Sequence, residues 1–86
     1  MQQAQATLDE VKELLATTLG IEDRIGSMDA STPLLGEVPE LDSLAVVAIA
    51  AEVEDRFHFQ VDDADFTAEV FETLGSLAAW VDANRR

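Results

Sequence analysis

The chain has 86 residues, with 18 Asp and Glu against five Lys and Arg, and its formal net charge at pH 7 is −13. Phosphate backbones and anionic membrane surfaces are held by Lys and Arg, so this balance excludes nucleic-acid-binding and membrane-surface proteins and favours partners with basic patches. Hydrophobic residues make up 48% of the chain, and its length predicts a single domain over residues 1–86 with one small core and no deep enzyme pocket.

Residue types that the chain lacks exclude several kinds of site. With no cysteine and a single histidine, it can form no disulfide, thiolate metal site, cysteine nucleophile or multi-histidine metal site. No apolar run approaches the length of a membrane span, and the N-terminal residues lack the basic and apolar regions of a signal peptide. We therefore expect a cytoplasmic protein.

One cluster of acids invites comparison with a calcium loop. Asp63 and Asp65 are spaced like the first two ligands of such a loop. Ala68, however, stands where the loop needs glycine, and Leu74 stands where it needs a bidentate glutamate. We expect an acidic, solvated helix start here and no metal site.

A helix is predicted over residues 7–19. Thr7 is the expected N-cap, Glu10 stands where it would complete a capping box, and Gly20 is the expected end. Its apolar residues recur at the spacing of one helix face: Leu8, Val11, Leu14, Leu15 and Leu19.

Residues 20–41 break this pattern. Glycine, proline and small polar residues interrupt the segment, which is typical of a loop. It nevertheless holds too many apolar residues for a free linker: Ile21, Ile25, Met28, Leu34, Leu35 and Val38. We therefore predict a long loop pinned across the core, and a loop of this length inside a small domain is commonly functional.

The next long helix is predicted from the N-cap Asp42 to about Phe57, and its apolar residues fall in two stripes. The stripe expected to face the core consists of Val46, Ile49, Ala50, Val53 and Phe57. The second stripe, on the opposite side, consists of Leu44, Val47, Ala48 and Ala51. A domain of this size can hardly bury every side of one helix, so the second stripe favours contact with a partner.

The rest of the chain predicts two further helical segments and no strand. A short, acid-started segment spans residues 62–70, and a last helix follows the cap Thr73. Arg85 and Arg86 stand at its end, where cations are favoured, and Trp80 is expected at the edge of the core. The buried face of this helix is expected to consist of Phe71, Leu74, Leu77, Ala78 and Val81. The predicted class is all-α.

The most informative string is Asp42-Ser43-Leu44, which ends the long loop and begins a helix. On its own this string is weak, because a capping aspartate before a serine is common. A phosphate ester on Ser43, however, would lie at a helix N-terminus, where free backbone N–H groups and the helix dipole favour negative charge.

Motif, placement and charge together resemble the acyl carrier protein family, the carriers of 4′-phosphopantetheine. The resemblance covers residues 7–82, from the first helix through the long loop to Phe57 and the Thr73-Leu74 start of the last helix. It implies a small four-helix bundle with a long loop between helices 1 and 2 and a short third helix. It also implies a carrier with no catalytic residues of its own.

The resemblance assigns roles to the residues of the motif. Ser43 would bear the 4′-phosphopantetheine arm, attached from coenzyme A by a phosphopantetheinyl transferase. The thiol of the arm would hold acyl groups as thioesters, which suits a chain without cysteine. Asp42 would cap the helix and help to position the transferase chemistry, and Leu44 would flank the arm.

The resemblance further implies a partner surface around Ser43. Acidic recognition would come from Glu37, Glu40, Asp42, Glu52, Glu54 and Asp55. Apolar contacts would come from Leu44, Val47, Ala48 and Ala51. The implied partners are the transferase and enzymes with basic patches that load or accept acyl groups, and the chain itself would be a monomer.

One departure from the family bears on the pathway. Many carriers of fatty acid biosynthesis have acids just after this motif, where this chain has Ala45 and Ala48. The departure favours a dedicated lipid, polyketide or exopolysaccharide-linked pathway. The strings Pro39-Glu40-Leu41-Asp42-Ser43 and Phe71-Glu72-Thr73 resemble the carriers that accompany bacterial exosortase and exopolysaccharide loci.

Three other interpretations stay open. A peptidyl or aminoacyl carrier of nonribosomal synthesis would share the fold and the arm, although the acidic balance and short length favour the acyl carrier. An unmodified helical interaction module would use Asp42 only as a cap and the second stripe for docking. A hydrolase built on Ser43 and His58 lacks a third, orienting group and a pocket.

Overall fold

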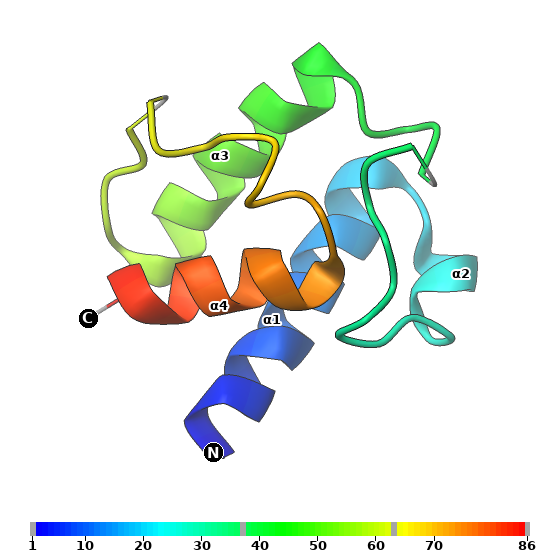
Figure 1. Cartoon of the computed structure of the whole chain (residues 1–86), viewed down its shortest axis with the longest axis horizontal. Helices are drawn as coiled ribbons and strands as arrows, with labels where there is room; N and C mark the ends of the chain where they lie inside the picture. The colour runs from blue at the N-terminus through cyan, green and yellow to red at the C-terminus, as the bar shows by residue number, and fades with distance from the viewer. Residues whose placement is uncertain (1, 37, 63, 86) are drawn as a thin grey trace.

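The computed structural model describes residues 2–36, 38–62 and 64–85, and this part of the chain forms four helices. In chain order they are α1 (Gln2–Leu19), α2 (Glu22–Ile25), α3 (Ser43–Phe57) and α4 (Leu74–Asn84). α1 contacts each of the other three, and its first turns extend beyond them (Figure 1). Because the described residues form no strand, the prediction of an all-α, four-helix fold is confirmed. Within the same ranges, no helix is both long enough and apolar enough to cross a membrane.

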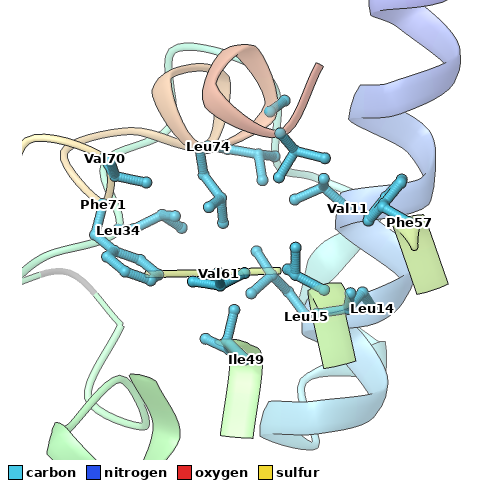
Figure 2. Packing of buried hydrophobic residues seen from close by; sticks show 14 of the residues in the cluster. Val11, Leu14, Leu15, Leu34, Ile49, Phe57, Val61, Val70, Phe71 and Leu74 are labelled. Carbon is cyan, nitrogen blue, oxygen red and sulfur yellow. The ribbon is translucent and has the colours of Figure 1, made fainter. Parts of the chain in front are cut away.

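The core lies where α1, α3 and α4 meet the two long connections between helices, and Figure 2 shows side chains from these segments converging. Most residues predicted to lie on a buried face do so, including every one predicted for the last helix. The core consists of Val11, Leu14, Leu15, Leu34, Val38, Ile49, Val53, Phe57, Val61, Val70, Phe71, Leu74, Leu77, Ala78 and Val81. Leu8 and Leu19, predicted on the same face of α1, are half-buried and pack against its rim.

The start of α1 differs from the prediction. The helix begins at Gln2, because the Gln and Ala residues before the apolar stripe have good helix propensity, and Thr7 therefore lies inside the helix and is not its N-cap. Thr7 is fully buried, and its hydroxyl donates to Asp82 Oδ1 at 2.8 Å and accepts from Arg85 Nη1 at 3.1 Å. Glu10 accepts from the same guanidinium at 2.8 Å. The two residues expected to cap α1 instead attach it to the end of α4.

The end of α1 agrees with the prediction. Gly20 has a φ of +69°, a left-handed conformation that glycine adopts without steric cost. The next N–H, of Ile21, reaches back to the Ala16 carbonyl at 3.0 Å, which is the hydrogen bond of a Schellman C-cap. Ile21 is then fully buried, so the turn delivers the chain directly to the interior.

Residues 20–42, called here the first connection, are pinned across the core as predicted. Leu34 and Val38 are buried among residues of the helices, whereas Leu35 between them is 46% exposed. The four-residue helix α2 lies within this segment and was not predicted, because so short a helix has no apolar periodicity.

A polar turn precedes the part of the first connection that enters the core. The Asp29 carboxylate accepts hydrogen bonds from the Ser31 hydroxyl and backbone N–H and from the Thr32 hydroxyl. These bonds hold the pKa of Asp29 below its ordinary value. Their contribution to the turn is therefore present at neutral pH and is lost as the pH falls through the lowered pKa.

Backbone hydrogen bonds attach the first connection to the start of α4. The Leu74 N–H donates to the Thr32 carbonyl at 2.9 Å, and the Gly75 N–H donates to the Ala30 carbonyl at 2.8 Å. The first N–H groups of a helix have no partner within the helix, so the connection supplies two of the acceptors that α4 needs. Thr73 supplies a third as the predicted N-cap, since its hydroxyl accepts the Ser76 N–H at 3.0 Å.

The second connection, residues 58–73, differs from the prediction of a short helix over 62–70. In the residues described it forms tight turns, and Asp63 lies outside those residues. The Asp62 carboxylate accepts the Ala64 N–H at 2.9 Å, a local bond of the kind that competes with helix formation. The short helix of this fold is thus α2, in the first connection.

Aromatic packing shapes the second connection. The Phe66 ring contacts Phe71 and Trp80, with centroids 4.6 and 5.1 Å apart, and Phe59 contacts Trp80 at 5.7 Å. Trp80 is half-buried at the edge of the core, as predicted.

The end of α4 is attached to α1 and to α3. Arg85 directly follows the helix, forms an ion pair with Glu10 at 2.8 Å and places its guanidinium 4.9 Å from the centroid of the Phe57 ring. Arg86 lies outside the described residues.

Replacing Gly75 tests the contact between the first connection and α4. A Cβ at Gly75 would lie 2.6 Å from the Ala30 carbonyl oxygen, so Gly75→Ala should destabilise the fold by about 1–3 kcal/mol, although alanine is the better helix former. Gly26→Ala is the matched control, because a Cβ there meets nothing within 4 Å and should change stability by no more than about 1 kcal/mol, towards stabilisation. Thermal melting compares the two. A Gly75→Ala variant as stable as wild type would show that the backbone at Ala30 can move away from the added methyl group without loss of stability.

Candidate functional site

The start of α3 is organised by Asp42. As predicted, Asp42 is the N-cap, with extended backbone angles (φ −117°, ψ −173°), and its carboxylate accepts the Ala45 N–H at 2.8 Å. Ser43 is the first residue of the helix, and it is exposed. The cap therefore presents the serine hydroxyl to solvent at the N-terminus of a long helix.

The surroundings of Ser43 favour an anion and contain no histidine. Free backbone N–H groups and the positive end of the helix dipole stabilise negative charge at this position. The single histidine, His58, is exposed beyond the opposite end of α3, about 20 Å away along the helix axis. Ser43 and His58 therefore form no dyad.

The two apolar stripes of α3 lie as predicted. Ile49, Val53 and Phe57 are buried, and Val46 and Ala50 are half-buried against the core. On the opposite side Leu44 is 81% exposed and Val47 is 66% exposed. Ala48 and Ala51 of the second stripe are exposed as well.

Among the described residues, the acids expected at the partner surface divide into some with partners within the chain and some without. Glu40 forms an ion pair with Arg24 of α2, and the Glu54 carboxylate accepts the Val61 N–H at 2.8 Å, so both have partners within the chain. Glu52 and Asp55 are exposed, and their side chains form no ion pair or hydrogen bond within the described ranges. Glu37 lies outside the described residues.

Comparison with known proteins identifies the family. The family model described as the phosphopantetheine attachment site matches residues 9–81. The solution NMR structure of a holo acyl carrier protein from Nitrosomonas europaea is similar to this structure with a TM-score of 0.82 and 45% sequence identity, covering 88% of this chain and 92% of that one. The chain belongs to the acyl carrier protein family.

Acyl carrier proteins are carriers and not enzymes, and they bear 4′-phosphopantetheine covalently. The start of α3 fits this group. Its serine hydroxyl is exposed at a helix N-terminus, and the nearby carboxylates of Asp42 and Glu40 are engaged by the cap and by Arg24. Members of the family interact with phosphopantetheinyl transferases and with acyl-handling enzymes.

Arg24, which pairs with Glu40 just before Ser43, is a residue near this site that no sequence pattern indicated. It stands 16 positions before Glu40, and the two are joined only by the fold of the first connection. In a chain with five Lys and Arg and 18 Asp and Glu, each cation is expected to pair with an acid, but the sequence does not identify which acid.

A comparison of two valines in α3 tests which stripe is core. Val53→Glu should unfold the protein, because Val53 is 1% exposed and an unpaired buried charge costs several kcal/mol. Val47→Glu should change stability by no more than about 0.5 kcal/mol, because Val47 is largely exposed. It should nevertheless impair acyl transfer to a cognate enzyme that buries this stripe.

Thermal melting and an acyl-transfer assay measure the two effects in the two variants. Collapse of the Val47→Glu variant would show that the second stripe belongs to the core. Normal transfer by a folded Val47→Glu variant would remove the stripe from the partner surface.

Proposed function

We propose that Ser43 carries 4′-phosphopantetheine and that the chain holds acyl groups as thioesters on this arm and delivers them to partner enzymes. The observation that carries the proposal is the exposed Ser43 at the first position of α3, directly after its capping aspartate, inside the matched family region. The whole chain, residues 1–86, would act as one carrier domain, as a monomer in the cytoplasm.

The other serines support the choice of Ser43. The Ser27 hydroxyl donates to the Arg24 carbonyl at 2.9 Å, and the Ser31 hydroxyl donates to Asp29 at 2.8 Å. The Ser76 hydroxyl donates to two backbone carbonyls beside the capping box of α4, at 2.8 Å each. Among the residues described, Ser43 is the serine whose hydroxyl has no hydrogen bond within the chain, so it can react without disrupting the fold.

The chemistry assigns different tasks to the carrier and the transferase. The Ser43 oxygen attacks the phosphorus of coenzyme A next to the pantetheine; the new O–P bond forms as the pyrophosphate bond breaks, and the nucleoside bisphosphate leaves. The serine proton must pass to a base of the transferase, because Ser43 has no histidine or free carboxylate beside it in the described structure. The carrier contributes the exposed hydroxyl and a helix N-terminus that favours the phosphodiester product.

The partner surface proposed here surrounds Ser43 on α3. The exposed side chains of Leu44, Val47, Ala48 and Ala51 would make the apolar contacts, and the free carboxylates of Glu52 and Asp55 would meet basic groups. Glu40 and Glu54 have partners within the chain and would therefore contribute less than the sequence predicts.

Ser43→Ala tests the attachment site. The variant should fold like wild type, because Ser43 is exposed and its hydroxyl forms no hydrogen bond within the described chain. It should gain no mass with coenzyme A and a promiscuous phosphopantetheinyl transferase, whereas the wild-type chain should gain the mass of the arm. Ser31→Ala, which changes another exposed serine, should gain the same mass as wild type. Modification of the Ser43→Ala variant would end the proposal, and an unmodified wild type would favour the unmodified interaction module.

The pathway is proposed to be a dedicated lipid, polyketide or exopolysaccharide-linked one, since Ala45 and Ala48 leave the start of α3 uncharged. Intact-mass analysis of the holo protein isolated from its own cells would identify the cargo. We expect a specialised acyl group. A mixture of ordinary saturated fatty acyl chains would instead assign the protein to housekeeping synthesis, and an aminoacyl mass would assign it to nonribosomal synthesis.

A further inference from the structure

The two described acids that closely precede Ser43 are both compensated within the chain. Asp42 lies at the positive end of the α3 dipole and accepts the Ala45 N–H at 2.8 Å. Glu40 is paired with the guanidinium of Arg24. The first turn of α3 contains no acid, and Leu44 there is 81% exposed. Among the described residues, the first turn of α3 is therefore apolar, and the carboxylates of Asp42 and Glu40 before it both have partners within the chain.

The opposite end of the same helix face is acidic. Asp55 follows Ala51 by four residues and Glu52 follows Ala48 by four, so both acids continue the second stripe along the helix. At 1.5 Å per residue they lie about 14–18 Å from Ser43 along the axis. Both carboxylates are exposed and without partners in the described structure.

The position of Arg24 contributes to this difference in free charge between the two ends of α3. The other two described arginines, Arg56 and Arg85, pair with Glu13 and Glu10 of α1 near the far end of α3. In the described structure Arg24 is the arginine paired at the Ser43 end. Its pair with Glu40 is well exposed, and such pairs add little to folding stability, so its main effect is on the charge that a partner meets.

We propose that Arg24 is a specificity-determining residue: it masks Glu40, so that the transferase which modifies Ser43 meets an apolar surface at the serine and finds its anionic contacts at Glu52 and Asp55. This inference rests on the proposed function of Ser43. The partner it selects has an apolar rim around its active site and Lys or Arg side chains about 14–18 Å away. An enzyme whose cations surround its active-site mouth would meet the carboxylates of Glu40 and Asp42 there, both already engaged within the chain.

The test measures the KM for the unmodified chain with a phosphopantetheinyl transferase that converts wild type to the holo form, at saturating coenzyme A. Arg24→Gln leaves Glu40 unpaired, and an apolar rim must then desolvate that carboxylate, so KM should rise about fivefold. The double variant Arg24→Gln/Glu40→Gln removes the carboxylate too and should return KM to within about twofold of wild type. A purely structural role for the ion pair would leave the double variant as impaired as the single one.

The location of the anionic contacts is tested by salt dependence. Glu52→Gln/Asp55→Asn should raise KM and flatten its dependence on salt, because the charges that attract the partner are gone. Glu69→Gln/Glu72→Gln is the matched control, since it makes the same change in net charge at exposed positions outside α3 and should retain the wild-type salt dependence.

Three results would overturn the inference while Ser43 is still modified. The first is a KM for Arg24→Gln equal to or below that of wild type. The second is a KM for Arg24→Gln/Glu40→Gln as high as that of Arg24→Gln. The third is a salt dependence of KM that is flattened as much in Glu69→Gln/Glu72→Gln as in Glu52→Gln/Asp55→Asn. Failure to find any phosphopantetheinyl transferase that adds the mass of the arm to the wild-type chain would overturn the proposed function itself, and this inference with it.

Discussion

Gly75 donates its backbone N–H to the Ala30 carbonyl at 2.8 Å, and the position of the first connection depends on this contact. A segment of this length would normally lie loose on the surface, because the entropy of ordering it is large. Here the free N–H groups of α4 supply the donors that hold it, and Leu34, a few residues on, enters the core. The close approach requires a residue without a Cβ at position 75. Because the same connection leads to Asp42, this contact also helps to place the start of α3.

Ser43 lies at one end of α3, and the contacts that attach α3 to α1 and α4 lie at the other. Phe57 and the Arg85 guanidinium lie together at the end of the helix, where α1, α3 and α4 are joined. Ser43 lies at the other end, where the helix face opposite the core is uncovered. Modification of Ser43, as proposed, can therefore add a large flexible arm without displacing a buried side chain. The same separation leaves the Ser43 hydroxyl without a histidine beside it, and in the proposed function the base comes from the transferase.

Much of this arrangement could be predicted from the sequence, because it depends on local patterns. The cap Asp42, the two stripes of α3, the Gly20 turn and the Thr73 cap each follow from residues within a few positions of one another. Several of the errors involve long-range contacts. Thr7 has the side chain of an N-cap, but it is buried against Asp82, 75 positions away. The segment 62–70 has helix-like composition, but its shape is set by Phe66 packing on Trp80. Arg24 and Glu40 meet only because the first connection folds back on α2, and no sequence pattern announces that pairing.

The few arginines of the chain decide which acids stay free on its surface. With a net charge of −13, unpaired acids anywhere on the surface attract basic partners at long range, so charge alone gives attraction without orientation. Orientation requires that some acids be neutralised and others left free. Arg56 and Arg85 neutralise acids of α1, and Arg24 neutralises Glu40 beside the exposed serine. Glu52 and Asp55 then remain as free carboxylates on the face that also carries the exposed apolar side chains. With the proposed role of Arg24, a partner drawn in by the net charge would place its basic groups at Glu52 and Asp55 and its apolar end at Ser43.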